Sequence, residues 1–461
     1  MNEQENLTSG NPENKMGVMP MNKLVLNMSL PLMASMIVQA LYNIVDSIFV
    51  AKVDNNALTA LSYAFPLQTL MISVAGGTGV GISAILSRAL GAKDGKRVNA
   101  AATNGVFVEL LSFLAFVLVG IFAVRPFYEI QTSNTAVVEY GVDYLSIVCI
   151  LSLGLFMQFT FERILQATGK TFQTMITQGV GAVINIILDP ILIFGYCGMP
   201  KMGVKGAALA TVIGQIVAAV LAIILNLKVN KEVGFSFKGF RPNGRLIGDI
   251  YKIGVPSIVM QSIGSVMVYG MNQILNSMEE TAVTVFGVYY KLQSFVFMPV
   301  FGLNNGIVPI IAYNYGAGKR RRLVKAVKIA TAYAVSIMIL GFILFQTIPV
   351  PLLRLFSATD RMLELGVPAL RIIGVHFLLA GFCIALGSVF QALGQAVYSL
   401  IVSVLRQLVV LLPAAYLLSL SGDANMVWWS FPIAELMSLV VTTVCFIRVY
   451  RRIIRNVPDN A

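Results

Sequence analysis

Two aspartates lie inside apolar stretches of the sequence, where a charged side chain needs a specific environment. Asp46 lies in an apolar run that begins near Leu30, and Asp189 follows the apolar residues Ile186, Ile187 and Leu188. A carboxylate at the centre of a membrane helix costs about 2.5–3.5 kcal/mol on insertion scales. A chain therefore retains such a group where it faces a cavity, has a partner or carries a proton.

The residues around Asp189 suggest two kinds of chemistry. Asn185 lies four residues earlier, so a helix would place both side chains on one face. Pro190 removes a backbone hydrogen bond and frees a carbonyl nearby. These oxygens, with Asp46, would suit a hard cation, and Na⁺ is one candidate. The carboxylates could carry a proton instead. In the structural alternative, each aspartate only bonds neighbouring helices and holds the bundle together.

Other polar residues inside or beside apolar runs have open roles. Four charged residues could pair, line a cavity or extend to the membrane surface: Glu109, Lys291, Arg406 and Glu435. We expect Glu162 and Arg163, next to a short connection, to lie at the membrane interface. His376 is either a satisfied polar group or a proton relay. Gln68 and Gln293 face a cavity or bond across helix packing.

The composition places the chain in a membrane and excludes several other classes of protein. Only 12% of residues are charged and 57% are hydrophobic, whereas soluble domains carry about 25% charged residues. The four cysteines form no CxxC or Cys/His cluster, so we expect no zinc site, disulfide framework or cofactor. The glycine run 76–81 has no GK[ST] after it, so an ion gradient, not ATP, is expected to drive any transport. The sequence shows no nucleophile–base pair of the kind that would indicate an enzyme.

Apolar runs long enough to span a bilayer need about 20 residues each. Twelve such runs predict an all-α polytopic membrane protein; they lie at 29–51, 58–86, 100–124, 140–161, 171–196, 204–227, 252–276, 282–312, 326–350, 367–390, 397–420 and 426–449. Alternate connections hold 24 Lys and Arg residues against 6 in the others. This bias predicts both termini in the cytoplasm of a cell-membrane protein. It also accounts for the net charge of +12, so we expect no binding to nucleic acid.

The two halves of the chain repeat. With a shift of 225, residues 57–93 align with 282–318 without a gap and with ten identities. The same shift places Pro31 on Pro256, and Gln166-Ala-x-Gly169 on Gln391-Ala-x-Gly394. Each half has six spans, so the halves share one orientation. This is the parallel-repeat arrangement of secondary transporters.

The repeat defines the expected domains. They are a polar cytoplasmic tail (1–22), a first lobe (23–228), a cytoplasmic linker with a short surface helix (229–251), a second lobe (252–450) and a basic cytoplasmic tail (451–461). The shift puts Met271 opposite Asp46, Val410 opposite Asn185 and Ala414 opposite Asp189. The polar set is therefore specific to the first lobe, which predicts one coupling site.

At these residues the chain resembles the multidrug and toxic compound extrusion (MATE) family, bacterial type, of the multidrug/oligosaccharidyl-lipid/polysaccharide exporter superfamily. The resemblance covers nearly the whole chain. The motifs that carry it are Pro31 with Asp46-Ser-Ile-Phe-Val, Gln166-Ala-Thr-Gly169, Asn185-x-x-x-Asp189-Pro190 and Gly203-Val-Lys-Gly-Ala-Ala-Leu-Ala-Thr211.

The resemblance implies a V of two six-helix bundles with alternating access. It implies export of cationic, amphipathic compounds in exchange for Na⁺ or H⁺, by what we expect to be a monomer. The implied coupling site is Asp46, Asn185, Asp189 and Thr211. We expect the substrate cavity to include Tyr42, Gln68, Met271 and Gln293. A second-lobe ion site used by some members has no counterpart here, because the matching stretches read Met260-Gln-Ser-Ile-Gly264 and Phe382-Cys-Ile384.

The nearest alternative function is a flippase for a polyprenyl-linked sugar on the related two-lobe fold. That function needs a strongly basic cavity for pyrophosphate, and only Lys291 and Arg406 are available within the spans. A scaffold or receptor would leave the two buried aspartates unexplained.

Overall fold

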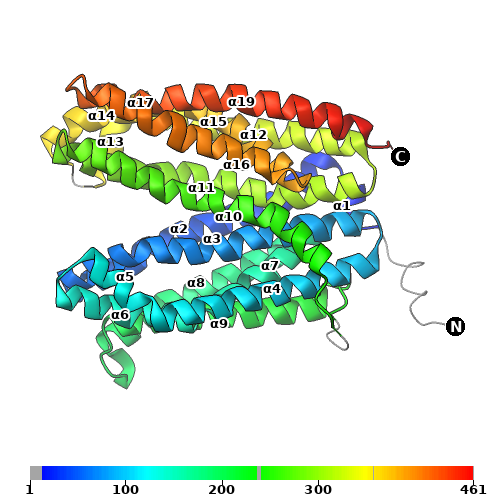
Figure 1. Cartoon of the computed structure of the whole chain (residues 1–461), viewed down its shortest axis with the longest axis horizontal. Coiled ribbons are helices and arrows are strands. Elements are labelled where there is room, and N and C mark those ends of the chain that lie inside the picture. The colour runs from blue at the N-terminus through cyan, green and yellow to red at the C-terminus, as the bar shows by residue number, and fades with distance from the viewer. Residues whose placement is uncertain (1–12, 236–239, 357, 460–461) are drawn as a thin grey trace.

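The computed structural model describes residues 13–235, 240–356 and 358–459. Residues 1–12 of the predicted N-terminal tail (1–22) lie outside these ranges. Within these ranges the chain is helical, and the only bridge between extended residues joins Lys319 to Asp459. Figure 1 shows two stacked groups of helices, with the short first helix (Lys15–Val18) and the end of the last long helix (Ser430–Arg452) at one end of the molecule. We call this end the terminal end. It holds Glu13 and Asp459, which bond the start of one second-lobe helix.

The first lobe follows the short helix α1 (Lys15–Val18). Its helices are α2 (Met21–Ala51), α3 (Asn55–Gly91), α4 (Gly95–Phe122), α5 (Val124–Gln131), α6 (Thr135–Ile150), α7 (Leu153–Ala167), α8 (Thr171–Phe194), the 3₁₀ turn η1 (Tyr196–Gly198) and α9 (Val204–Val229).

The second lobe repeats this order. Its helices are α10 (Gly244–Asn276), α11 (Glu280–Gly316), α12 (Arg320–Thr347), α13 (Pro349–Arg354), α14 (Asp360–Gly374), α15 (Phe377–Ala392), α16 (Ala396–Val404), the π-helix η2 (Leu405–Leu411), α17 (Leu412–Ser419), α18 (Ala424–Val427), α19 (Ser430–Arg452) and the 3₁₀ turn η3 (Ile454–Asn456).

The predicted twelve spans agree with the helices found. In the described part of the chain, ten helices are long and apolar enough to cross a membrane, and two bent pairs bring the number to twelve. The bent pairs are α6 with α7, at 45°, and α14 with α15, at 48°, and they lie at equivalent places in the two lobes. Large apolar side chains such as Leu118, Leu340 and Val440 remain more than half exposed, as expected for a surface that faces lipid.

The linker differs from its prediction. Its described residues, 230–235 and 240–243, form no surface helix. Instead α10 begins at Gly244, ahead of the predicted lobe boundary, because the side chain of Asn243 accepts from the Leu246 amide and caps the helix. Hydrogen bonds from the amides of Gly234 and Asn243 to Asn99 and Asn104 attach the linker to α4.

The lobes meet where α2 and α3 pack against α10 and α11. Glycines allow this contact at the terminal end, and the contacts are symmetric. A Cβ on Gly91 would lie 2.0 Å from the carbonyl oxygen of Tyr313, and one on Gly316 would lie 2.0 Å from that of Arg88. The shift of 225 exchanges these two contacts. The repeat seen in the sequence is therefore a pseudo-twofold axis between the lobes.

A second pair of contacts follows the same symmetry. A Cβ on Gly77 would lie 2.7 Å from the backbone nitrogen of Ile258, and one on Gly302 would lie 2.6 Å from that of Met33. We call the surface formed by these four glycine contacts the seam. All of its glycines lie in the halves of α3 and α11 nearer the terminal end, so the lobes are packed together at that end.

The N-terminal segment (13–20) crosses the seam. On the second lobe, Arg322 donates to the carbonyl oxygens of Met16 (3.1 Å) and Met19 (2.8 Å). The hydrogen bond from Lys319 holds the pKa of the Glu13 carboxyl below its usual value. On the first lobe, Asn14 donates to the Thr168 carbonyl (3.0 Å). This segment therefore ties the two lobes together in the present conformation.

The seam predicts that an added methyl group will separate the lobes at the terminal end. We expect Gly316→Ala to lower the free energy of unfolding by about 1–3 kcal/mol, because helix backbone must move aside. Gly287→Ala is the matched control, since it lies on α11 with open space around its Cβ. Thermal unfolding of the purified protein in detergent measures both, and equal midpoints would contradict the prediction.

Candidate functional site

Three of the four predicted coupling residues are in direct contact. Asn185 and Asp189 lie one turn apart on α8, and the Asn185 amide nitrogen is 3.5 Å from Asp189 Oδ1. The same nitrogen is 3.4 Å from Thr211 Oγ1 on α9. Thr211 donates its own proton to the Ala207 carbonyl (3.1 Å), so its oxygen is free to accept from Asn185.

Close packing of α8 and α9 brings Thr211 to this place. A Cβ on Gly214 would lie 2.8 Å from the carbonyl oxygen of Gly181, so both helices approach at a glycine. Thr211 is three residues before Gly214 and faces Asn185 across this contact. The small residues thus position a polar pair that spacing along the sequence does not reveal.

Asp46 approaches the same centre from α2. The rings of Phe49 and Phe194 meet edge-on, with centroids 6.3 Å apart, and fix α2 against α8. Asp46 lies three residues before Phe49 on α2, and Asp189 lies five residues before Phe194 on α8, so this contact brings the two aspartates to the same level of the lobe. The side chain of Asp189 has no exposed surface and that of Asn185 is 4% exposed. Two carboxylates in such surroundings cannot both stay charged without a compensating charge.

Three buried oxygen atoms at this centre have no hydrogen-bond donor among the described residues. They are Asp46 Oδ1, Asn185 Oδ1 and Asp189 Oδ2. Buried polar atoms in folded proteins are nearly always satisfied. The described residues contain no group of three or more His, Cys, Asp and Glu side chains that could hold a metal ion. The donor set is instead two carboxylates and an amide, which suits a proton or a hard, oxygen-seeking cation.

The residues expected to line a substrate cavity are in different environments. Tyr42 lines a cavity of about 90 Å³ together with Asn185 and Thr211. Gln68 donates to the Tyr144 hydroxyl (2.9 Å), so it bonds across helix packing. Gln293 is half-buried. Met271 has no exposed surface and packs in the hydrophobic core, so the structure does not bring it to a cavity wall, because its face of α10 is covered by neighbouring helices.

The same cavity reaches Glu162, which the sequence placed at the membrane interface. That prediction is wrong, since Glu162 is only 3% exposed. Its carboxylate accepts from Gln158 (3.0 Å), Thr177 (2.8 Å) and Gln178 (2.7 Å). The place of Glu162 near the connection after α7 did not predict its burial, because α8 covers this face of α7. The polar stripe of Gln158, Glu162 and Gln166 along α7 is the signal that would have found it.

Arg163 is half-buried and makes two side-chain hydrogen bonds within the protein. It donates to Gln166 Oε1 (3.1 Å) and, across the seam, to Asn305 Oδ1 (3.0 Å) on α11. Glu109 has no exposed surface, and neither carboxylate oxygen has a hydrogen-bond partner among the described residues. Lys291 is exposed, with Nζ 5.9 Å from the centre of the Phe356 ring.

The second lobe has a buried charged chain of its own. Glu435 Oε2 lies 3.3 Å from the guanidinium of Arg406 and 3.5 Å from His376 Nδ1. His376 Nε2 lies 3.2 Å from the hydroxyl of Tyr289. Arg406 lies in η2, and such π-helical turns often occur at functional sites. His376 is therefore a partnered polar group, and Arg406 and Glu435 pair with each other.

The family model MatE matches residues 31–191 and again residues 256–417. The two matches begin 225 residues apart, which is the shift found in the sequence, and together they cover most of the chain. The chain belongs to the MatE family. The prediction of a MATE-type fold with twelve membrane helices in two lobes is confirmed by these matches and by the helices described above.

The MatE chain is similar to curated multidrug exporters along its length. It is 28% identical over 421 residues to the multidrug export protein MepA of Staphylococcus haemolyticus (strain JCSC1435), covering 90% of each chain. It is 27% identical over 419 residues to MepA of Staphylococcus aureus (strain MRSA252), covering 90% of this chain and 91% of MepA.

Solved structures share the fold. The outward-facing conformation of a multidrug resistance MATE family transporter of the MOP superfamily aligns with a TM-score of 0.90 and 24% identity, over 96% of this chain and 99% of that one. A MOP superfamily transporter from Pyrococcus furiosus, described as having a binding pocket of reverse polarity, aligns with a TM-score of 0.88 and 23% identity, over 96% and 98%.

The cluster around Glu162 generates a stability prediction. We expect Glu162→Ala to lower the free energy of unfolding by about 1–3 kcal/mol, because the buried Thr177 hydroxyl and the half-buried amides of Gln158 and Gln178 lose an acceptor. Glu162→Gln should lose less, since an amide oxygen still accepts. Glu129→Ala is the surface control, with a side chain 56% exposed in a loose ion pair, and should change little. Thermal unfolding distinguishes the three, and similar losses for Glu162→Ala and Glu129→Ala would refute it.

Proposed function

We propose that this MatE protein exports cationic, amphipathic compounds from the cell in exchange for Na⁺ or H⁺. The observation that carries the proposal is the set of three buried oxygen acceptors at Asp46, Asn185 and Asp189, which lack donors in the described chain. The relatives named as multidrug export proteins support the export of drugs. The named relatives also support a transport role and not an enzymatic one.

The coupling ion would act by neutralising the first-lobe centre. Without a bound ion, Asp46 and Asp189 would bring two negative charges into one centre with buried, unpartnered oxygens, where each charge disfavours the other. A bound Na⁺ or a proton removes this repulsion and satisfies the free oxygens. Asn185 would orient the acceptors, and Thr211 would hold the Asn185 amide through the contact at 3.4 Å. No other cofactor is required.

Loading of the centre would change the packing of the lobes through α2. This helix carries Asp46 and also packs against α8 of its own lobe and α11 of the other. A ligand shifts a conformational equilibrium only through its different affinity for the two states. We propose that ion binding favours one arrangement of α2 and that substrate binding favours the other.

The surroundings of the chain follow from charge placement. Lys and Arg residues concentrate at the terminal end, among them Lys96, Lys319, Arg322, Arg451 and Arg455. We infer that this end and both termini face the cytoplasm, in a multi-pass protein that works as a monomer in the cell membrane. The same basic residues meet the expected anionic leaflet, which accounts for the net charge without nucleic acid.

The alternative, flipping of a polyprenyl-linked sugar, is less well supported. A pyrophosphate would need several uncompensated cations in the central cavity. Of the two cations predicted within the spans, Arg406 is paired with Glu435 at 3.3 Å, and Lys291 alone is exposed. Transport of a short-chain polyprenyl pyrophosphate by proteoliposomes, at a rate exceeding that of an organic cation, would favour this alternative.

The coupling site predicts a loss of driven export without a loss of folding. We expect Asp46→Asn and Asp189→Asn each to reduce gradient-driven ethidium export by about tenfold or more, a coupling free energy of at least about 1.4 kcal/mol. The charge on the carboxylate would no longer respond to the ion. Asp143→Asn is the matched control, because Asp143 lies on α6 in the same lobe and pairs only with the exposed Lys205 at 3.3 Å.

Export is measured in vesicles under a Na⁺ gradient alone and a pH gradient alone, which also identifies the ion. Membrane insertion and the thermal midpoint are measured for every variant. Full export by both variants under the gradient that drives the wild type would overturn the proposed coupling site. If the wild-type protein exports ethidium equally fast with and without a gradient, the proposed exchange is overturned.

A further inference from the structure

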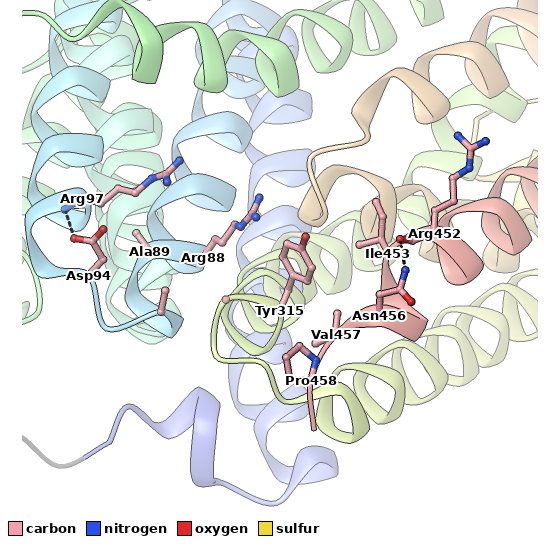
Figure 2. Close-up of a pocket in the computed structure, with 12 residues that line it drawn as sticks. Arg88, Ala89, Asp94, Arg97, Tyr315, Arg452, Ile453, Asn456, Val457 and Pro458 are labelled. Atoms are coloured by element: carbon pink, nitrogen blue, oxygen red, sulfur yellow. Dashed lines mark hydrogen bonds between the residues drawn. The ribbon is translucent and has the colours of Figure 1, made fainter. Parts of the chain in front are cut away.

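A second, larger cavity lies between the lobes at the terminal end. Its volume is about 470 Å³, within the range of small-molecule sites. First-lobe residues from the end of α3 and the start of α4 form one wall, and second-lobe residues from the ends of α11 and α19 form the other. Figure 2 shows these two walls, with Arg88 and Arg97 on one side, Arg452 on the other, and Tyr315 between them.

The charges that line this cavity are not balanced. Asp94 is the one acidic residue of the lining, and its Oδ1 already accepts from the Arg97 amide (3.0 Å) and caps α4. Arg97 pairs with Asp249 at 3.3 Å. Within the described residues, Arg88 and Arg452 have no carboxylate within salt-bridge distance. Arg88 and Arg452, one from each lobe, therefore line the cavity as exposed arginines without an acidic partner among the described residues.

Arg88 is held in a suitable orientation for an anion. Its guanidinium lies over the ring of Tyr315 from the other lobe, 4.5 Å from the ring centre. Stacking on a ring leaves the edge of a guanidinium, which bears its N–H donors, free to bond. Planar donors of this kind match phosphate oxygens in pairs.

We propose that this cavity binds a phosphate-bearing anion, either the headgroup of an anionic phospholipid or a soluble phosphate, through Arg88 and Arg452. Arg97 lies on the same wall and adds to the positive potential. The proposal rests on the proposed function only for the statement that the lobes move; binding itself does not depend on the ion or the exported compound.

The site exists only while the lobes are packed at this end. Arg88 and Gly316 both line the cavity, and they are also partners in the seam, where the Arg88 carbonyl contacts Gly316. Separation of the lobes would move Arg452 and Tyr315 away from Arg88. An anion bound to both walls would therefore stabilise the present conformation and oppose opening at the terminal end.

Basic residues are common at the cytoplasmic end of any membrane protein, so the test needs variants with equal charge. The site variant is Arg88→Gln with Arg452→Gln. The matched control is Lys96→Gln with Arg451→Gln, which removes two charges from exposed positions on α4 and α19 that do not line the cavity. Each double variant loses two positive charges, so the two variants have the same net charge.

Binding is measured on the full-length protein as a shift in the thermal midpoint. One arm adds inorganic phosphate in detergent against chloride of equal ionic strength. The other compares vesicles of phosphatidylcholine with vesicles of phosphatidylcholine and phosphatidylglycerol in equal parts. We expect the wild type and the control to be stabilised, and the site variant to bind about tenfold more weakly or more. A response only to phosphatidylglycerol identifies the lipid headgroup, and one to phosphate in detergent identifies the soluble anion.

Equal stabilisation of the site variant and the control would overturn the proposal, as would the absence of a response in both arms. If the double variant does not fold, Arg452→Gln is compared with its neighbour Arg451→Gln. Spin labels at Lys228→Cys and Lys328→Cys, with the native cysteines replaced by alanine, report the distance between the lobes. The anion should increase the population with the shorter distance. Loss of this effect leaves the ion-coupling proposal intact, and failure of ion coupling leaves this one intact.

Discussion

A carboxylate buried in a lipid-embedded helix bundle has to be neutralised, and the two lobes meet this constraint in different ways. In the second lobe, Glu435 has a cation within the protein, because Arg406 lies 3.3 Å away. In the first lobe, Asp46 Oδ1 and Asp189 Oδ2 are buried without a hydrogen-bond partner among the described residues. Glu435 therefore has a compensating charge within the protein, whereas the proposed first-lobe centre would need one from solution. That dependence is what a coupling site requires, and it is the physical reason to seek the ion in one lobe only.

The duplication was retained in the packing and lost in the charges. Gly91 and Gly316 make equivalent contacts with Tyr313 and Arg88, so the seam keeps its pseudo-twofold symmetry. The charged centres do not, since the shift of 225 places Gly181 opposite Arg406 and Ala210 opposite Glu435. Two lobes that rock against each other need matching surfaces, because each must accommodate the same movement. In the proposed exchange, one ion needs only one binding centre, and the second lobe carries the Arg406–Glu435 pair at positions unrelated to that centre.

The sequence predicted those features that depend on local periodicity and on the repeat. The spans follow from apolar runs, and the shared face of Asn185 and Asp189 follows from a spacing of four residues. Features that depend on contacts between distant segments were not predictable. The Glu162 cluster needs α8 to lie on α7, and the Arg406–Glu435 pair joins residues 29 positions apart through a π-helical turn. Met271 is buried because neighbouring helices cover it. The linker has no surface helix in its described part, because its amides bond α4 instead.

The helix α2 links the proposed coupling centre to the seam without a relay of side chains. Met33 lies at the seam against Gly302, and Asp46 lies thirteen residues further along the same helix, a rise of about 20 Å. Before α2, the carbonyl oxygens of Met16 and Met19 are held by Arg322 of the other lobe. The segment that begins α2 is thus attached to the second lobe at the terminal end, and α2 meets the acidic centre near its other end. In the proposed mechanism, a change of charge at Asp46 acts on a helix that packs against both lobes, so the proposed coupling needs two positions of α2 and no pathway through the core.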